Sequence, residues 1–316
     1  MEETIIKLKK QRNILFAITV TVVALLFFTY INSIKGLLSK NAQDNIAKQS
    51  PQDKKQNQDR QNISVLANEV LPTEGVELPV VWKGMGKSLV LAGVIDDAKF
   101  QEVYAGRGEL SADEQKLLFA DDNGHITINT KNASLLLNLL WAFGLSNKND
   151  VLEKGDMMDP QYGGAGRFAS TAGWTLSQGE TMDHYSKHRF MTLTAEQQSA
   201  VEEVAKNIYR PCCGNSTYFP DCNHGMAMLG LLELMASQNV SKKNMYQYAL
   251  AVNSYWFPDI YLNIANYFKN IERVNWDKVD PKKALSYDYS SNRGYQQILS
   301  KIEPQKSQSN GGGCSV

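Results

Sequence analysis

One stretch of the chain organises the fold around it. It reads Tyr209-Arg-Pro-Cys-Cys-Gly-Asn-Ser-Thr-Tyr-Phe-Pro-Asp-Cys-Asn-His-Gly-Met-Ala-Met228 and continues as Leu229-Gly-Leu-Leu-Glu-Leu-Met-Ala236. Pro211 and the glycine-led polar run after the two cysteines predict a loop. The apolar residues that follow His224 predict a buried helix, for which Asp221 or Asn223 is the expected N-terminal cap. The sequence therefore predicts a loop that ends directly at the start of a core helix.

The same stretch contains four side chains that bind soft or borderline metal ions, and they are Cys212, Cys213, Cys222 and His224. Thiolate and imidazole groups are ligands that zinc and copper(I) favour. Cys222 and His224 stand where the helix is expected to begin, and a helix N-terminus favours a thiolate over a thiol. We therefore predict a metal site here, with zinc or copper as the ion.

Two other uses of these cysteines remain open. In one, the thiols are redox-active and the protein is a thiol–disulfide oxidoreductase, although the chain lacks the Cys-x-x-Cys motif of that class. In the other, Cys222 forms a disulfide with Cys212 or Cys213, and the protein is a structural module of the cell envelope. The spacing matches no standard zinc finger, and a haem-attachment motif is absent.

Three residues elsewhere are additional candidate ligands. His184 and His188 are four residues apart, so a helix would place them on one face, where they would supply ligands or a proton shuttle. Ordinary surface or core positions are an equal alternative for them. Tyr185 stands where a zinc peptidase needs glutamate, which excludes that reading. Cys314 follows a glycine run in the C-terminal tail, and it is either a mobile ligand or an unpaired cysteine.

The N-terminus predicts a membrane anchor. Ile14 to Ile31 carries no charge and is long enough to cross a bilayer as a helix. Lys7, Lys9, Lys10 and Arg12 precede it, so the positive-inside rule keeps the N-terminus in the cytoplasm. A cleaved signal peptide is the alternative, but no small-residue cleavage site follows the apolar run. The sequence thus predicts a single-pass protein of the cell membrane whose main domain is extracytoplasmic.

Composition divides the rest of the chain. We expect a cytoplasmic N-terminus at 1–12, a signal anchor at 13–34, a disordered polar linker at 35–69, a domain at 70–302 and a flexible tail at 303–316. Lysine plus arginine equal aspartate plus glutamate, 33 each, so no basic field attracts nucleic acid. The membrane is therefore the one partner that the sequence predicts.

The domain is expected to be mainly α-helical, with a few short strands. Apolar runs favour strands at Val76–Trp82 and Ser88–Ile95, and a turn leads into a further strand that ends at Ile128. Residues 155–180 are rich in glycine and predict a long loop. Capping residues and periodicity predict helices at Asp96–Ala105, from Ser111, at Ala133–Phe143 with Gly144 as its end, at Thr194–Ile208, at Lys242–Ser254, at Ile260–Ile271 and from Lys282.

The Pro211-Cys-Cys and Asp221-Cys-Asn-His segments carry a resemblance. They look like the corresponding segments of a membrane-anchored bacterial family, and they are similar to the exported PCYCGC-motif proteins. The likeness covers Arg210 to His224. Gly214 and Asn215 stand where that motif has further cysteines. The resemblance implies export and metal handling, and it assigns no catalytic chemistry.

Overall fold

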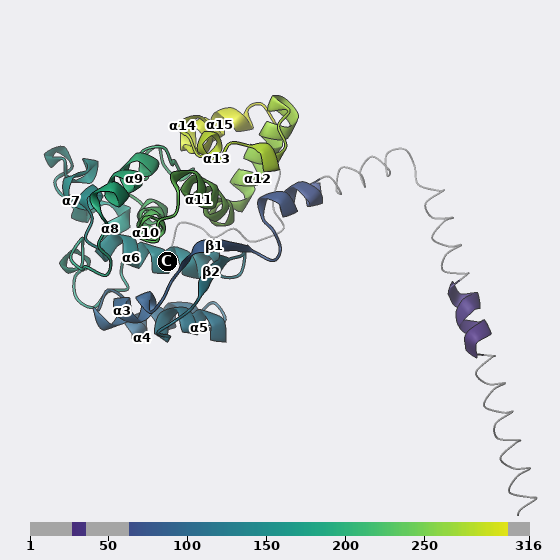
Figure 1. Ribbon diagram of the computed structural model, residues 1–316, viewed down its shortest axis with the longest axis horizontal. Coiled ribbons are helices and arrows are strands. Elements are labelled where there is room, and N and C mark those ends of the chain that lie inside the picture. The colour runs from purple at the N-terminus through teal and green to yellow at the C-terminus, as the bar shows by residue number, and fades with distance from the viewer. Residues whose placement is uncertain (1–26, 36–62, 303–316) are drawn as a thin grey trace, which may run out of the picture. The chain divides into compact units, whose positions relative to one another are not determined.

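The computed structural model describes residues 27–35 and 63–302 of the 316-residue chain (Figure 1). The chain divides into two compact units, Met1–Ile63 and Ser64–Val316. In the first unit, residues 27–35 form a helix with exposed side chains. Most of the expected anchor and linker, and the expected tail with Cys314, lie outside the described residues. Within the described ranges, no helix combines the length and the apolar character that crossing a bilayer requires.

Two long apolar helices form the centre of the second unit. They are α6 (Ala133–Ser146) and α10 (Asn223–Ser237), and nearly every side chain of both is buried. Two glycines let their backbones touch, because a Cβ on Gly230 would lie 2.5 Å from Leu140 O and one on Gly144 only 2.2 Å from Met226 O. The prediction that Gly144 ends its helix is wrong. It lies inside α6, where the missing side chain admits the neighbouring helix.

Further helices surround this pair (Figure 1). α9 (Ala195–Ala205) and α11 (Lys242–Trp256) both pack against α10, and α12 (Pro258–Tyr267) packs against α11. A π-helical turn, Phe268–Glu272, continues α12, so the predicted helix to Ile271 is two segments. The C-terminal end of the described chain consists of α13 (Pro281–Ala284), α14 (Tyr287–Ser290) and α15 (Asn292–Leu299). The mainly helical prediction is confirmed.

A small sheet and three helices lie between Val76 and the start of α6. β1 (Val76–Val81) pairs antiparallel with β2 (His125–Ile128), and Val76 stands opposite Ile128. The expected strand at Ser88–Ile95 is wrong, because α3 (Met85–Leu91) covers its first half and the second half is turn. A short apolar run fits either structure, and here packing decides. Gly86 brings α3 against the backbone of α5 (Ala112–Phe119), since a Cβ would lie 1.9 Å from Leu117 O. The third helix is α4 (Asp97–Ala105).

The glycine-rich segment after α6 is not a plain loop. One short α-helix, α8 (Ala169–Ala172), lies within residues 155–180, and another, α7 (Asp150–Lys154), ends just before them. Between and after them run single 3-10 turns, which are Asp156–Met158, Pro160–Tyr162, Ala165–Arg167 and Thr181–Asp183. Another 3-10 turn, Trp276–Lys278, precedes α13. Each piece is too short for its periodicity to stand out in the sequence.

Candidate metal centre

A tight loop returns the vicinal cysteines to the start of α10. Tyr209 and Ser216 form an antiparallel bridge, and Thr217 N donates to Ile208 O at 2.8 Å. This pairing closes the chain between them into a narrow loop. Cys212 and Cys213 lie within that loop, and the chain then runs on to Cys222. The loop predicted from the proline and glycine therefore places all three thiols at one helix end.

Cys222 itself is the N-terminal cap of α10. Its Sγ accepts a hydrogen bond from Gly225 N at 3.4 Å. The predicted caps Asp221 and Asn223 are therefore wrong. Asp221 binds other groups of the loop, and Asn223 is already the first helical residue. A sulfur at this position receives the unpaired N–H groups and the positive end of the helix dipole.

Three potential ligands converge at this point. Cys212 Sγ lies 3.4 Å from Cys222 Sγ, and each has a ligand atom within 4.8 Å of the other and of a His224 ring nitrogen. A disulfide has an S–S distance of about 2.0 Å, so these two sulfurs are not bonded to each other. The group Cys212, Cys222 and His224 could hold a metal ion. The two thiols are half-buried, whereas His224 is buried.

A second group shares Cys222. It consists of Cys213, Asp221 and Cys222, whose ligand atoms also lie within 4.8 Å of one another. Cys213 Sγ lies 3.8 Å from Asp221 Oδ1 and 3.9 Å from Asn215 O. The four residues predicted as one ligand set are thus divided, with Cys222 in the middle. This second group could hold a metal ion through two sulfurs and one carboxylate.

A buried arginine connects the groups. Arg210 is only 1% exposed, and its Nε donates to Cys222 Sγ at 3.0 Å. Its Nη1 donates to Asn215 O at 3.0 Å, and its Nη2 donates to Phe219 O at 2.9 Å and forms an ion pair with Asp221. Glycine is needed opposite the guanidinium, since a Cβ on Gly225 would lie 2.5 Å from Arg210 Cζ.

The pKa values of these groups follow from their contacts. Hydrogen bonds from Cys212 and Cys213, and then the charge of Arg210, hold the pKa of Cys222 well below its ordinary value despite burial. For Cys213, the bond with Cys212 lowers the pKa, but the bond with Cys222 and burial outweigh it and raise the pKa to about 11. Burial lowers the pKa of Arg210, but Cys222, Cys213 and Asp221 raise it more. Of Cys213 and Cys222, Cys222 is therefore the thiol that ionises more readily.

The walls behind the ligands are apolar. The His224 ring packs against Phe257, with ring centroids 4.3 Å apart, and against Trp256 at 5.8 Å. Met226 and Met228 are buried in the core among neighbouring helices. Such burial is typical of methionines that fill gaps between packed helices. The ligand atoms available here are therefore sulfur and nitrogen from Cys212, Cys222 and His224.

The histidine pair lies apart from this cluster. His184 Nδ1 and His188 Nε2 are 3.1 Å apart, and His184 Nε2 is 2.8 Å from Gln178 O. The residues between them do not form a helix, because a 3-10 turn ends at Asp183 and His188 pairs with Asn147 in a bridge. Neither histidine belongs to a group of three or more potential ligands within the described residues. Cys314 lies outside those residues.

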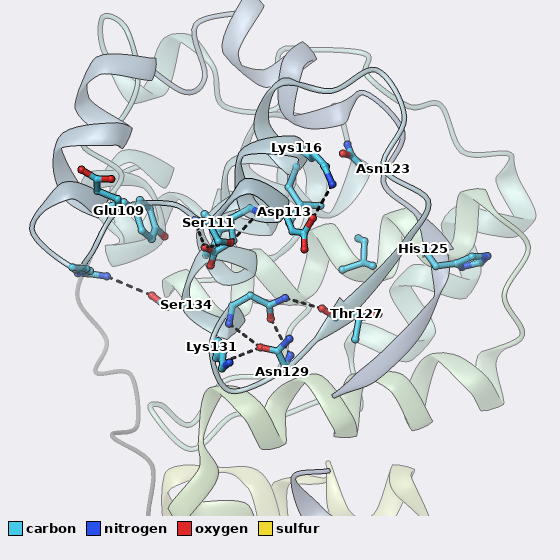
Figure 2. Close-up of a pocket in the computed structure, with 17 residues that line it drawn as sticks. Glu109, Ser111, Asp113, Lys116, Asn123, His125, Thr127, Asn129, Lys131 and Ser134 are labelled. Carbon is cyan, nitrogen blue, oxygen red and sulfur yellow. Dashed lines mark hydrogen bonds and ion pairs between the residues drawn. The ribbon is translucent and has the colours of Figure 1, made fainter. Parts of the chain in front are cut away.

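A separate cleft of about 790 Å³ lies beside β2 and α5. Figure 2 shows that its polar side chains bind one another: Lys116 pairs with Asp113 at 2.8 Å, and Arg107 donates to Ser134 at 3.4 Å. Its lining includes side chains of both charge signs, and none of the residues of the cysteine cluster lines it. The cleft is therefore a polar hollow distinct from the candidate metal centre.

Two residues of the cysteine cluster, Arg210 and Asp221, were not predicted as part of it from the sequence. Arg210 lies two residues before Cys212, but nothing in its spacing indicates a buried guanidinium. Asp221 was predicted only as a helix cap. The signal that could have indicated Arg210 is that three cysteines, which are potential thiolates, follow it within twelve residues. Buried anions need a cation or hydrogen-bond donors nearby, and Arg210 is the nearest cationic residue in the sequence.

The fold and the cluster define a helical domain with a Cys/His group able to hold a metal ion. No family model, curated protein or solved structure matches the chain.

Proposed function

We propose that this protein binds a soft or borderline metal ion through Cys212, Cys222 and His224, and that it serves in metal handling or sensing. One observation carries the proposal: two half-buried thiols and a buried imidazole, from a loop and a helix start, have their ligand atoms within 4.8 Å of one another. Two thiolates and an imidazole are ligands of zinc, and also suit copper(I). Arg210 supports it, since a donor bound to a ligating sulfur fixes the orientation of that ligand.

Metal analysis of the purified full-length protein tests the proposal. Protein prepared under a phosphine reductant should carry close to one ion per chain. His224→Asn should lose this ion, because imidazole is one of three ligands. His125→Asn is the matched control, since His125 is exposed and stands outside the cluster. Metal content that is equal in the two variants, or absent from the parent protein, would refute the proposal.

A second candidate function, thiol–disulfide exchange, is favoured by the distance between two sulfurs. The 3.4 Å between Cys212 Sγ and Cys222 Sγ is short enough for a small movement to form a disulfide. The protein would then be a thiol–disulfide oxidoreductase with Cys222 as the attacking thiolate. Catalysed reduction of a disulfide substrate that is abolished in Cys222→Ser, by protein that carries no metal, would favour this function. A permanent disulfide at Cys222 in the native protein would instead indicate a structural module.

We further propose that the domain is exported and held at the membrane by the N-terminal segment. The uncharged run from Ile14 to Ile31 and the cationic residues before it support this orientation. A reporter enzyme that is active only outside the cytoplasm, fused after Val316, should be active. A mature protein that is soluble and begins near Asn32 would refute the anchor.

A further inference from the structure

The Cys212, Cys222 and His224 group provides three ligands, whereas zinc in proteins is bound by four in most sites. Among the described residues, no other histidine, cysteine, aspartate or glutamate extends this group within the same 4.8 Å. Zinc sites with three protein ligands are those that leave their fourth position to a water or an exogenous molecule, whereas structural zinc sites are closed by the protein.

The nearest alternatives from the chain are engaged elsewhere. Asp221 Oδ1 pairs with the guanidinium of Arg210, and its Oδ2 accepts from Asn215 Nδ2 at 2.8 Å. Arg210 is buried, so an ion that took Asp221 as ligand would leave a buried guanidinium without its carboxylate. Cys213 interacts with Cys212 and Cys222, but its ligand atom is not within 4.8 Å of all three ligands of the first group. Its Sγ lies 3.8 Å from Asp221 Oδ1 and 3.9 Å from Asn215 O. Both residues therefore belong to the arginine side of Cys222.

We infer that the metal ion has three ligands from this chain and takes its fourth, a thiolate, from outside. This inference rests on the proposed metal-binding function. Cys212 and Cys222 are half-buried while His224 is buried, so the ion is approached from the side of the sulfurs. A thiolate suits an ion that already has two sulfur ligands.

An external ligand of this kind has a chemical consequence. Thiolate from a small thiol, or from a cysteine of another protein, joins the ion without any ligand of the chain leaving first. The ion could then pass to the incoming molecule by stepwise exchange, in which each new sulfur replaces one of Cys212, Cys222 and His224. No electron is transferred: each incoming thiol releases its proton to the solvent, and each cysteine of the chain that leaves the ion takes up a proton from it. Such an arrangement suits an ion that is delivered or removed.

Cobalt(II) in the full-length protein tests this inference, because its absorption bands report the number of thiolate ligands. The protein is loaded under a phosphine reductant and titrated with 2-mercaptoethanol, while cobalt content is followed by metal analysis. The thiolate-to-cobalt band should grow by about one half, the step from two thiolates to three in a four-ligand site. A short cysteine-containing peptide, used in a parallel titration, distinguishes a protein thiol from a small one as the better source.

Two variants provide the controls. Cys213→Ser and Cys314→Ser should leave the initial band unchanged and should respond to 2-mercaptoethanol as the parent protein does. If the initial band is weaker in either variant, the fourth ligand comes from the chain and the inference is wrong. A band that ignores added thiol while cobalt stays bound also overturns it. Failure to bind cobalt at all would instead refute the proposed function.

Discussion

A single guanidinium determines how the cluster residues are arranged. Arg210 joins Cys222, two backbone carbonyls of the loop and Asp221, and it is almost fully buried. A buried charge is tolerated only where such partners replace water. The planar fork of arginine reaches partners in several directions at once, which a lysine could not do. Arg210 thus fixes the loop with respect to the helix that carries two of the ligands.

A second buried ionisable group, Glu233, lies further along α10. It is fully buried, and its Oε2 accepts a hydrogen bond from Asn147 Nδ2 at 2.5 Å. Burial raises the pKa of Glu233 from 4.5 to about 8, although bonds from Asn147 and Asn149 lower it in part. The folded protein therefore keeps a proton on Glu233 that the unfolded chain releases near its ordinary pKa.

This difference predicts a pH-dependent stability. Between about pH 4.5 and pH 8 the folded state holds the extra proton, so the Glu233 contribution to the free energy of unfolding falls by about 1.4 kcal/mol per pH unit. The contribution is fully present below about pH 4.5 and is lost above about pH 8. Glu233→Gln should lack this dependence and gain stability relative to the parent protein as pH rises, measured by urea unfolding. Glu102→Gln, at an exposed site, is the control.

A Glu233→Gln difference that stays constant across this pH range would show that Glu233 is ionised in the folded protein. The sequence did not indicate this residue, because a glutamate inside an apolar helix is compatible with an exposed stripe. Only the contact between α10 and the end of α6 shows that it is buried. The candidate metal ligands could be predicted, since cysteine and histidine are recognisable as ligands from their residue types alone. Their arrangement into two groups that share Cys222 could not be predicted, because it depends on how the loop folds.

At the scale of elements, the crossing of α6 and α10 depends on two glycines. A Cβ on Gly230 would lie 2.5 Å from Leu140 O and 2.9 Å from Gly144 N. Gly230→Ala must therefore push the two central helices apart, and we expect it to lower the free energy of unfolding by about 1–3 kcal/mol or more. Urea unfolding of the apo protein measures this loss.

Gly106→Ala provides the matched control for that substitution. Gly106 has a φ of −68°, and a Cβ there would meet only Val103 O, at 3.9 Å. Alanine fits this conformation and reduces the entropy of the unfolded chain, so the control should be neutral or slightly stabilising. Equal effects of the two substitutions would mean that the central helices can separate without cost.

Several helix starts were predictable because their signals are local. Ser111 and Thr194 form capping boxes with Glu114 and Gln197, as expected, and Ser241 caps α11 through Asn244 N. Helix ends and the strand-like run at Ser88–Ile95 depended on contacts with distant segments. Gly144 is the clearest case, since a glycine near a helix end and a glycine at a helix crossing look alike in one sequence.

At the scale of the whole domain, the metal centre is connected to the C-terminal helices. Asn292, the first residue of α15, donates from its backbone N to Cys213 O at 3.0 Å and from Nδ2 to Pro211 O at 3.3 Å. Tyr209 N donates to Leu285 O at 2.8 Å. The loop that carries two of the cysteines is thus held between the start of α10 and the α13–α15 segment.

This connection predicts that the ion stabilises the C-terminal helices along with the loop. Hydrogen exchange of the Asn292 and Tyr209 amides should slow when zinc replaces a chelator, by up to about a hundredfold at a free ion concentration one hundred times Kd. The ladder amides of β1 and β2 provide the comparison, because the sheet lies outside these contacts. The exchange rates of these sheet amides should change less on zinc binding, wherever the amides exchange through local opening of the sheet. If Asn292 exchanges at one rate with and without zinc, while zinc is bound, the loop folds independently of the ion.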